Sequence, residues 1–222
     1  MTPERSSTCK GGIHRRSIYY REIVQRFLII CEGEKTEPLY FEAFKVPKDV
    51  RAIKIIGAGQ NTLSLVKEAI KLRGQDEYDQ VWCVFDVEDY SVQAIHAATD
   101  LANNNDIQVA CSNQAFELWY LLHFDFFNIA TDRKRYYEKL TELLNFPYDK
   151  NIPLYSRLID RQKTAIMYAQ RLLQQYQPYD PAKSNPSTTV HLLVEQLNRF
   201  TPESRTRQQT EGKQRGSNRK SL

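Results

Sequence analysis

The sequence predicts an α/β protein in which a parallel sheet of about four strands is flanked by helices. Short apolar runs, which are typical of strands buried on both faces, occur at residues 27–31, 52–56, 81–85 and 107–111. Between them lie segments with apolar residues three and four positions apart, at about 37–44, 62–73 and 91–103. Strands and helices that alternate in this order indicate parallel strands joined by right-handed crossovers.

Local signals support the starts of two predicted helices and the end of one strand. Pro38 stands in the first turn of the first helix, where its missing N–H costs nothing. Gly57 and Gly59 stop the second strand, and Ser91 is a suitable N-cap for the third helix.

The pattern changes after about residue 130, because only helical spacing follows. An apolar helix is predicted to begin in 115–124, and further helices are predicted at 133–144, 161–176 and 188–200. We therefore divide the chain into four parts. These are a flexible basic segment (1–22), an α/β core (23–130), a helical extension packed on the core (131–200) and a disordered basic tail (201–222).

Composition gives a broad class and a charge pattern. The chain is 41% hydrophobic and 26% charged with a net charge of +4, which is ordinary for a globular protein. Both basic ends carry more Lys and Arg than Asp and Glu, which favours either contact with a phosphate backbone or a merely solvated terminus. No apolar run reaches the roughly 18 residues of a membrane span, so we expect a soluble, cytoplasmic protein.

The four cysteines do not form a metal-binding or disulfide pattern. Cys31, Cys83 and Cys111 each lie in an apolar run, far apart, and Cys9 lies in the basic N-terminal segment. A free thiol in such a run behaves as a small hydrophobic side chain. We therefore expect these three to be core residues.

Acidic residues follow two of the predicted strands. Glu32 comes directly after the first strand, and Asp86, Glu88 and Asp89 come after the third. In an open parallel sheet, ligands bind beyond the carboxyl ends of the strands. Asp86 and Glu88, at alternate positions, can converge on one cation, and such oxygen ligands suit Mg²⁺ or Mn²⁺. Glu32 could complete the set of ligands or move a proton during attack on a phosphodiester.

Four sequence blocks resemble the RloB family. They are FLIICEGEKTEP at 27–38, VWCVFD at 81–86, SNQAFELWYLLHF at 112–124 and NPSTTV at 185–190. The blocks occur in order and span about residues 26–200. The resemblance implies a Toprim-like fold and a nuclease activity. It also implies an association with phage defence and abortive infection, often beside a partner ATPase.

The resemblance also implies roles for the acidic residues. Glu32 would act in general acid–base catalysis, and Asp86 and Glu88 would bind the metal. Glu88 stands where the family pattern D-x-D has a second aspartate, so the adjacent Asp89 is an alternative ligand. Glu37, Glu117 and Lys35 are supporting candidates.

Several alternatives remain open on sequence alone. Glu117 either lines the site or meets a structural partner, and His123 fits a core histidine better than a ligand. The segment around Lys35 lacks the full pattern of a nucleotide-binding loop, so nucleotide hydrolysis is not supported. A nuclease acting on DNA or RNA, with tRNA as one candidate substrate, is the leading hypothesis, and assembly into an oligomer is left open. The rival is a non-catalytic interaction or regulatory module of a defence complex.

Overall fold

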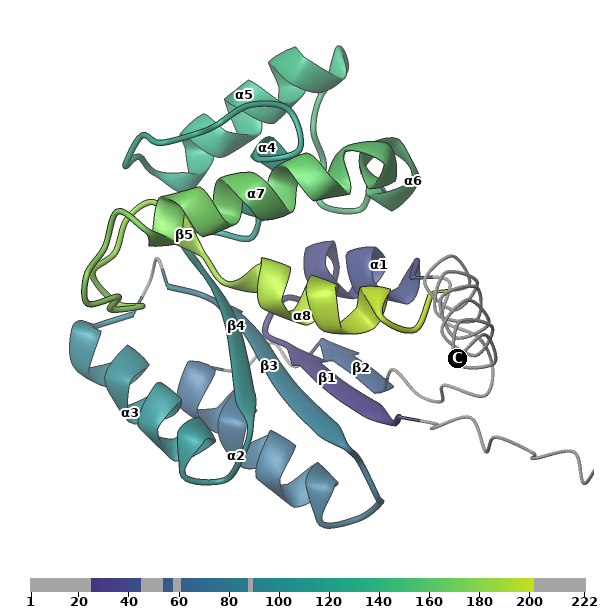
Figure 1. Cartoon of the computed structure of the whole chain (residues 1–222), viewed down its shortest axis with the longest axis vertical. Helices are drawn as coiled ribbons and strands as arrows, with labels where there is room; N and C mark the ends of the chain where they lie inside the picture. Colours follow the sequence, from purple (N-terminus) through teal and green to yellow (C-terminus); the bar gives the residue numbers. More distant parts are fainter. Residues whose placement is uncertain (1–24, 45–53, 58–60, 88–89, 202–222) are drawn as a thin grey trace, which may run out of the picture.

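The protein is an open α/β domain whose central sheet is mostly parallel (Figure 1). The computed structural model describes residues 25–44, 54–57, 61–87 and 90–201. The strands are β1 (Phe27–Cys31), β2 (Lys54–Gly57), β3 (Gln80–Asp86), β4 (Gln108–Asn113) and β5 (Ser187–Thr188). Their order in the sheet is β2-β1-β3-β4-β5, with the first four parallel and β5 antiparallel to β4. The predicted fold class is therefore confirmed.

The predicted order of helices between the strands is also present. Helices α1 (Thr36–Glu42), α2 (Thr62–Arg73) and α3 (Val92–Asn103) connect the four parallel strands. Ser91 caps α3 as expected, because its hydroxyl accepts a hydrogen bond from the Ala94 N–H at 3.2 Å. Asn61 caps α2 in the same way, with 2.9 Å to the Ser64 N–H.

Alternation of side chains along the strands produces a core on each face of the sheet. In β1, Phe27, Ile29 and Cys31 face one core, whereas Leu28 and Ile30 face the other. Helices α2 and α3 cover the second face, and α1 and α8 (Val190–Asn198) lie on the first (Figure 1). The apolar runs are therefore unbroken because both faces are buried. Cys31, Cys83 and Cys111 are free thiols inside these cores, as predicted.

The C-terminal part is helical and packs against the sheet layer. It contains α4 (Glu117–Leu121), α5 (Arg133–Leu144), α6 (Tyr155–Leu158), the 3₁₀ turn η1 (Ile159–Arg161), α7 (Gln162–Leu173) and α8. Figure 1 shows α4, α5 and α7 stacked beyond α8 and α1. Their apolar side chains join the core cluster that contains β1 and β3 residues.

Two features of this region differ from the sequence prediction. The helix expected over 115–124 is a short α4 of five residues. The helix expected from 188 begins at Val190, because Ser187 and Thr188 first pair with Asn113 and Ser112 as β5. The pairing continues through Thr189, whose hydroxyl accepts a hydrogen bond from the Cys111 N–H at 2.9 Å. The segment before α8 is thus part of the sheet.

Three expectations concern residues beyond this description. The flexible segment 1–22, nearly all of the tail 201–222, and the acids Glu88 and Asp89 lie outside the described residues. Among the residues that are described, no helix combines the length and apolar character required to cross a bilayer.

Candidate functional site

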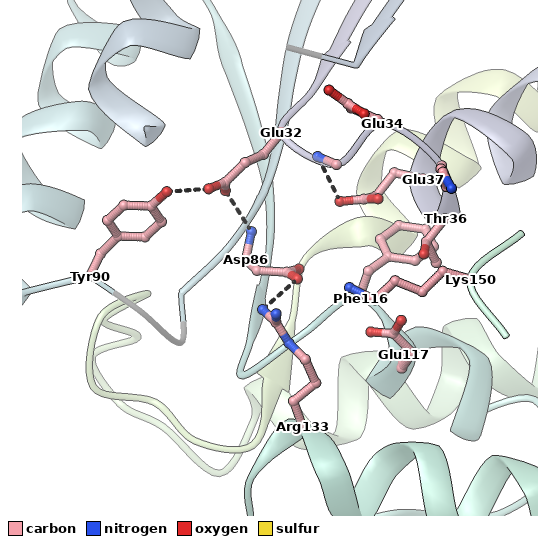
Figure 2. A pocket seen from close by; sticks show the side chains of 12 residues that line it. Glu32, Glu34, Thr36, Glu37, Asp86, Tyr90, Phe116, Glu117, Arg133 and Lys150 are labelled. Carbon is pink, nitrogen blue, oxygen red and sulfur yellow. Dashed lines mark hydrogen bonds and ion pairs between the residues drawn. The ribbon is translucent and has the colours of Figure 1, made fainter. Parts of the chain in front are cut away.

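The register of the sheet brings the two predicted acidic strand ends together. β1 and β3 are adjacent and parallel, with Cys31 opposite Val84. The ladder continues one residue further, because the Glu32 N–H donates to the Val84 carbonyl at 2.8 Å. Glu32 and Asp86 therefore emerge side by side at the carboxyl edge of the sheet (Figure 2).

Glu32 is held in place from two directions. The Asp86 N–H donates to Glu32 Oε2 at 3.3 Å, and the Tyr90 hydroxyl donates to Glu32 Oε1 (Figure 2). Tyr90 precedes α3, and its N–H donates to the Val87 carbonyl at 3.3 Å. These two donors fix the orientation of a carboxylate that opens onto a cavity.

The charge of Asp86 is compensated only in part by the described residues. Its side chain is only 18% exposed, and Oδ1 is buried with no hydrogen-bond partner in the described part of the chain. Oδ2 lies 3.4 Å from Arg133 Nη2. Burial, followed by the negative charges of Glu37 and Glu117, raises the pKa of Asp86 well above its usual value, and Arg133 opposes this only in part. A bound cation would offset this repulsion and stabilise the charged carboxylate.

Glu37 and Glu117 add two buried carboxyl groups to this site. Glu37 is 4% exposed and Glu117 is 1% exposed. Burial raises the pKa of Glu37 to about 7, and the charge of Glu117 adds to the shift. Hydrogen bonds from Gly33 N–H to Glu37 Oε1 (3.3 Å) and from the Tyr148 hydroxyl to Glu117 Oε1 (2.8 Å) hold them.

Gly33 has a steric role beside Glu37. A Cβ on residue 33 would overlap the Glu37 carboxylate, which is itself buried and cannot move into solvent freely. The sequence signal, a glycine between two glutamates after a strand, is therefore explained by the close approach of the backbone to the side chain of Glu37.

The helical part of the chain supplies cationic groups to the same cavity. Arg133 is the first residue of α5, and the α5 N-cap Asp132 accepts a hydrogen bond from the Arg135 N–H at 3.0 Å. Lys150 lies between α5 and α6 with its ammonium 5.7 Å from the centre of the Tyr137 ring. Partial burial opposes the charge of Lys150, but the Tyr137 hydroxyl and Glu117 together raise its pKa. Lys150 therefore stays protonated at neutral pH.

The acids and bases enclose a cavity of about 340 Å³. Its lining combines strand ends, the start of α1, α4 and the helical extension: Glu32, Gly33, Glu34, Lys35, Thr36, Glu37, Asp86, Tyr90, Phe116, Glu117, Arg133 and Lys150. Figure 2 shows the carboxyl groups of Asp86, Glu37 and Glu117 on one side, and that of Glu32 turned toward Tyr90 and the Asp86 N–H.

The structure brings together five of the seven residues predicted for the site. Glu32, Glu37, Asp86, Glu117 and Lys35 all line the cavity, whereas Glu88 and Asp89 lie outside the described residues. Glu117 thus both lines the site and has a structural partner in Tyr148. In the described part of the chain, no three His, Cys, Asp or Glu side chains are placed to share one metal ion.

Sequence reasoning missed Tyr90, Arg133, Tyr148 and Lys150. Tyr90 carried a weak signal, because it closes the acidic segment after β3. Arg133 follows a helix cap, but nothing near it indicates the sheet. Lys150 and Tyr148 lie in a loop with no recognisable pattern.

His123 does not belong to the cavity, and its expected core role fits the structure. Its Nδ1 donates to the Trp119 carbonyl at 2.8 Å, and the ring stacks edge-on against Trp119. Burial lowers the pKa of His123 to about 4, so it remains neutral in the core.

These features define an open α/β protein with an acid-rich, cation-flanked cavity at the carboxyl edge of a parallel sheet. The chain belongs to the RloB-like protein family, whose sequence pattern matches residues 27–197. Among the described residues, that match includes every strand and every α-helix except the last residue of α8. No curated protein and no solved structure matches the chain.

Proposed function

We propose that this protein is a Mg²⁺-dependent, Toprim-type nuclease that cleaves phosphodiester bonds of a nucleic acid. The observation that carries the proposal is the partly buried Asp86, whose buried Oδ1 has no partner among the described residues and which lies among three further carboxyl groups. Buried charges of one sign are unfavourable without a counter-charge. Such a cluster at the carboxyl edge of a parallel sheet suits a divalent cation.

The residues present fit an open Mg²⁺ or Mn²⁺ site, in which water and substrate supply part of the coordination shell, better than a site in which protein side chains supply every ligand. Mg²⁺ commonly binds through one or two carboxylates and completes its shell with water and substrate phosphates. Asp86 would be a direct ligand, and Glu88 or Asp89 would be the second. Glu37 and Glu117 would hold metal-bound water. The absence of three convergent ligands in the described residues is consistent with such an open site.

The chain's own residues have separable roles in this proposal. Glu32, oriented by Tyr90 and the Asp86 N–H, would accept the proton of the attacking water or return it to the leaving group. Arg133, Lys150 and Lys35 would bind phosphate oxygens. A bound Mg²⁺ would polarise the scissile phosphate and neutralise the charge that develops during attack.

The biological setting is part of the proposal and rests on the family. An RloB-like nuclease would act in bacterial phage defence together with a partner ATPase. Its substrate would be DNA or RNA, with tRNA as one candidate. The Lys and Arg excess at both ends of the chain would add affinity for any phosphate backbone, whatever its sequence.

The proposal is tested by incubating the purified protein with tRNA, single-stranded DNA and duplex DNA, each with Mg²⁺, Mn²⁺ or EDTA. We expect one class of nucleic acid to be cut, only with metal present. Cleavage that persists in EDTA would contradict metal dependence. Metal binding without cleavage of any of the three would favour the alternative, a non-catalytic Toprim-like module that regulates a defence complex.

The second metal ligand is assigned by a paired comparison. Glu88→Gln and Asp89→Asn each remove one negative charge from adjacent positions. The variant that weakens Mn²⁺ binding more identifies the ligand, since the shape of each side chain is retained.

A further inference from the structure

Arg133 lies beside Asp86, the carboxylate that we propose binds the divalent cation. It projects from the first position of α5 into the cavity, and its Nη2 lies 3.4 Å from Asp86 Oδ2 (Figure 2). Both side chains are largely shielded from water, at 27% exposure for Arg133 and 18% for Asp86. The guanidinium is thus the positive group that the structure sets against this carboxylate.

The contact is nevertheless weak for a guanidinium–carboxylate pair. A strong pair is bidentate, with two hydrogen bonds of about 2.7–2.9 Å. Here a single nitrogen lies at 3.4 Å, and Asp86 Oδ1 takes no part. Arg133 therefore compensates the charge of Asp86 without saturating it.

A divalent cation on Asp86 would alter the balance at Arg133. Two positive centres within a few ångströms repel strongly where water is largely excluded. The carboxylate that attracted the guanidinium would then be neutralised by the metal. The flexible stem of arginine allows the guanidinium to turn away, and phosphate oxygens are acceptors that match its fork.

We infer that Arg133 is a resident counter-cation of Asp86 that gives way to the divalent ion and then binds the substrate phosphate. This inference rests on the proposed function, because it assumes that Asp86 binds a metal. On this account Arg133 faces Asp86 in the free protein and the substrate phosphate in the complex. It competes with the metal in the free protein and contributes to substrate binding in the complex.

Two other basic residues, Lys150 and Arg135, provide matched comparisons. Lys150 lines the same cavity, but its ammonium lies over the Tyr137 ring and interacts with Glu117. Arg135 is on the same helix as Arg133 and pairs with Glu138 at 3.1 Å on the surface. Removing either charge changes the net charge of the protein as much as removing Arg133 does.

The test is Mn²⁺ affinity, measured without nucleic acid by the loss of the free-Mn²⁺ spin-resonance signal. The wild type, Arg133→Gln, Lys150→Gln and Arg135→Gln are titrated at one ionic strength. We expect Arg133→Gln to bind Mn²⁺ roughly fivefold or more tightly, because a competing charge a few ångströms away is removed. Lys150→Gln should gain less, and Arg135→Gln should match the wild type. Arg133→Met, which keeps an unbranched stem, is measured in parallel in case the glutamine variant folds poorly.

The same Arg133 variants should bind nucleic acid more weakly in Ca²⁺, which supports binding without turnover in many Mg²⁺ enzymes. Unchanged or weaker Mn²⁺ binding by both Arg133 variants would overturn the inference and leave the proposed function intact. An equal gain in Lys150→Gln would also overturn it, because the effect would then be general. If neither wild type nor Asp86→Asn binds Mn²⁺, the proposed metal site falls together with the inference.

Discussion

At the scale of single residues, Glu32 and Asp86 are neighbours with different surroundings. Glu32 accepts hydrogen bonds on both oxygens, whereas Asp86 has a weak ion pair on one oxygen and no partner on the other among the described residues. A carboxylate with both oxygens fixed is oriented for proton transfer. A carboxylate with a buried, uncompensated oxygen is suited to a cation. Their environments therefore favour different roles.

Replacing Glu32 with glutamine tests the proton-transfer role. The amide keeps the shape and one acceptor oxygen but cannot take up a proton at neutral pH. We expect the cleavage rate to fall by about 100-fold or more. The free energy of unfolding should change by less than about 1 kcal/mol, because one hydrogen bond is altered rather than a core contact. Single-turnover cleavage and thermal melting provide the two readouts.

Glu34→Gln is the control for this substitution. Glu34 lies in the same loop and is exposed, and its replacement by glutamine removes the same charge as Glu32→Gln does. Wild-type turnover in Glu32→Gln, or an equal loss in Glu34→Gln, would contradict the assignment of Glu32.

Glu37 predicts a pH dependence of stability. Its pKa in the folded protein is about 7, above the usual value of a glutamate, because the side chain is buried near Glu117. Between these two pKa values the folded state binds more protons than the unfolded state. The metal-free protein should therefore lose stability as pH rises from about 4.5 through 7.

Glu37→Gln removes this titration, because the amide is neutral throughout. The fall in melting temperature between pH 5 and pH 8 should be smaller in the variant than in the wild type. The melting temperatures are measured in EDTA. An equal fall in melting temperature between pH 5 and pH 8 in the two proteins would show that Glu37 does not titrate in this range.

At the scale of elements, α5 controls where Arg133 lies. Asp132 caps the helix, and Arg133 is its first residue. Asp132→Ala removes the cap and should lower the free energy of unfolding by about 1 kcal/mol. Because the first turn would fray, we also expect weaker binding of nucleic acid, seen as a raised KM. Asp132→Asn retains a capping oxygen and should show neither effect. If Asp132→Ala lowers stability but leaves KM unchanged, the position of Arg133 does not contribute to substrate binding.

Elements also show how far sequence alone could go. β1 and β3 were predictable because burial on both faces demands unbroken apolar residues, and the acids at their ends followed from that. β5 was not, since a strand of two residues has no periodicity and owes its pairing to β4. Glu32 and Asp86 lie at strand ends and were predicted from that position, whereas Glu37 on α1 and Glu117 on α4 were predicted only as supporting candidates. Arg133 and Lys150 arrive through helix packing, which no local pattern encodes.

At the scale of the whole molecule, the distribution of charge predicts salt-dependent binding. The segment from 203 to the C-terminus is rich in Lys and Arg and almost free of apolar side chains. Removing residues 203–222 should weaken binding at low salt and flatten the log–log salt dependence, by roughly 0.9 for each lost phosphate contact on duplex DNA. The cleavage rate at saturating substrate should not change, because the cavity is intact.

Fluorescence anisotropy over a range of salt concentrations provides this measurement. A full-length chain with the tail basic residues changed to glutamine is the matched control, since it keeps the length and removes the charge. An unchanged salt slope in both proteins would exclude the tail from nucleic-acid binding and favour a contact with a partner protein.

The central claim is that the cavity at the carboxyl edge of the sheet cleaves phosphodiesters with a divalent cation at Asp86. Its most direct test is the cleavage rate as a function of Mg²⁺ concentration for the wild type and Asp86→Asn, on whichever nucleic acid is cut. We predict a saturable dependence in the wild type and, in Asp86→Asn, at least about a 100-fold lower rate with a higher Mg²⁺ requirement. Equal rates and equal Mg²⁺ dependence in the two proteins would contradict the claim.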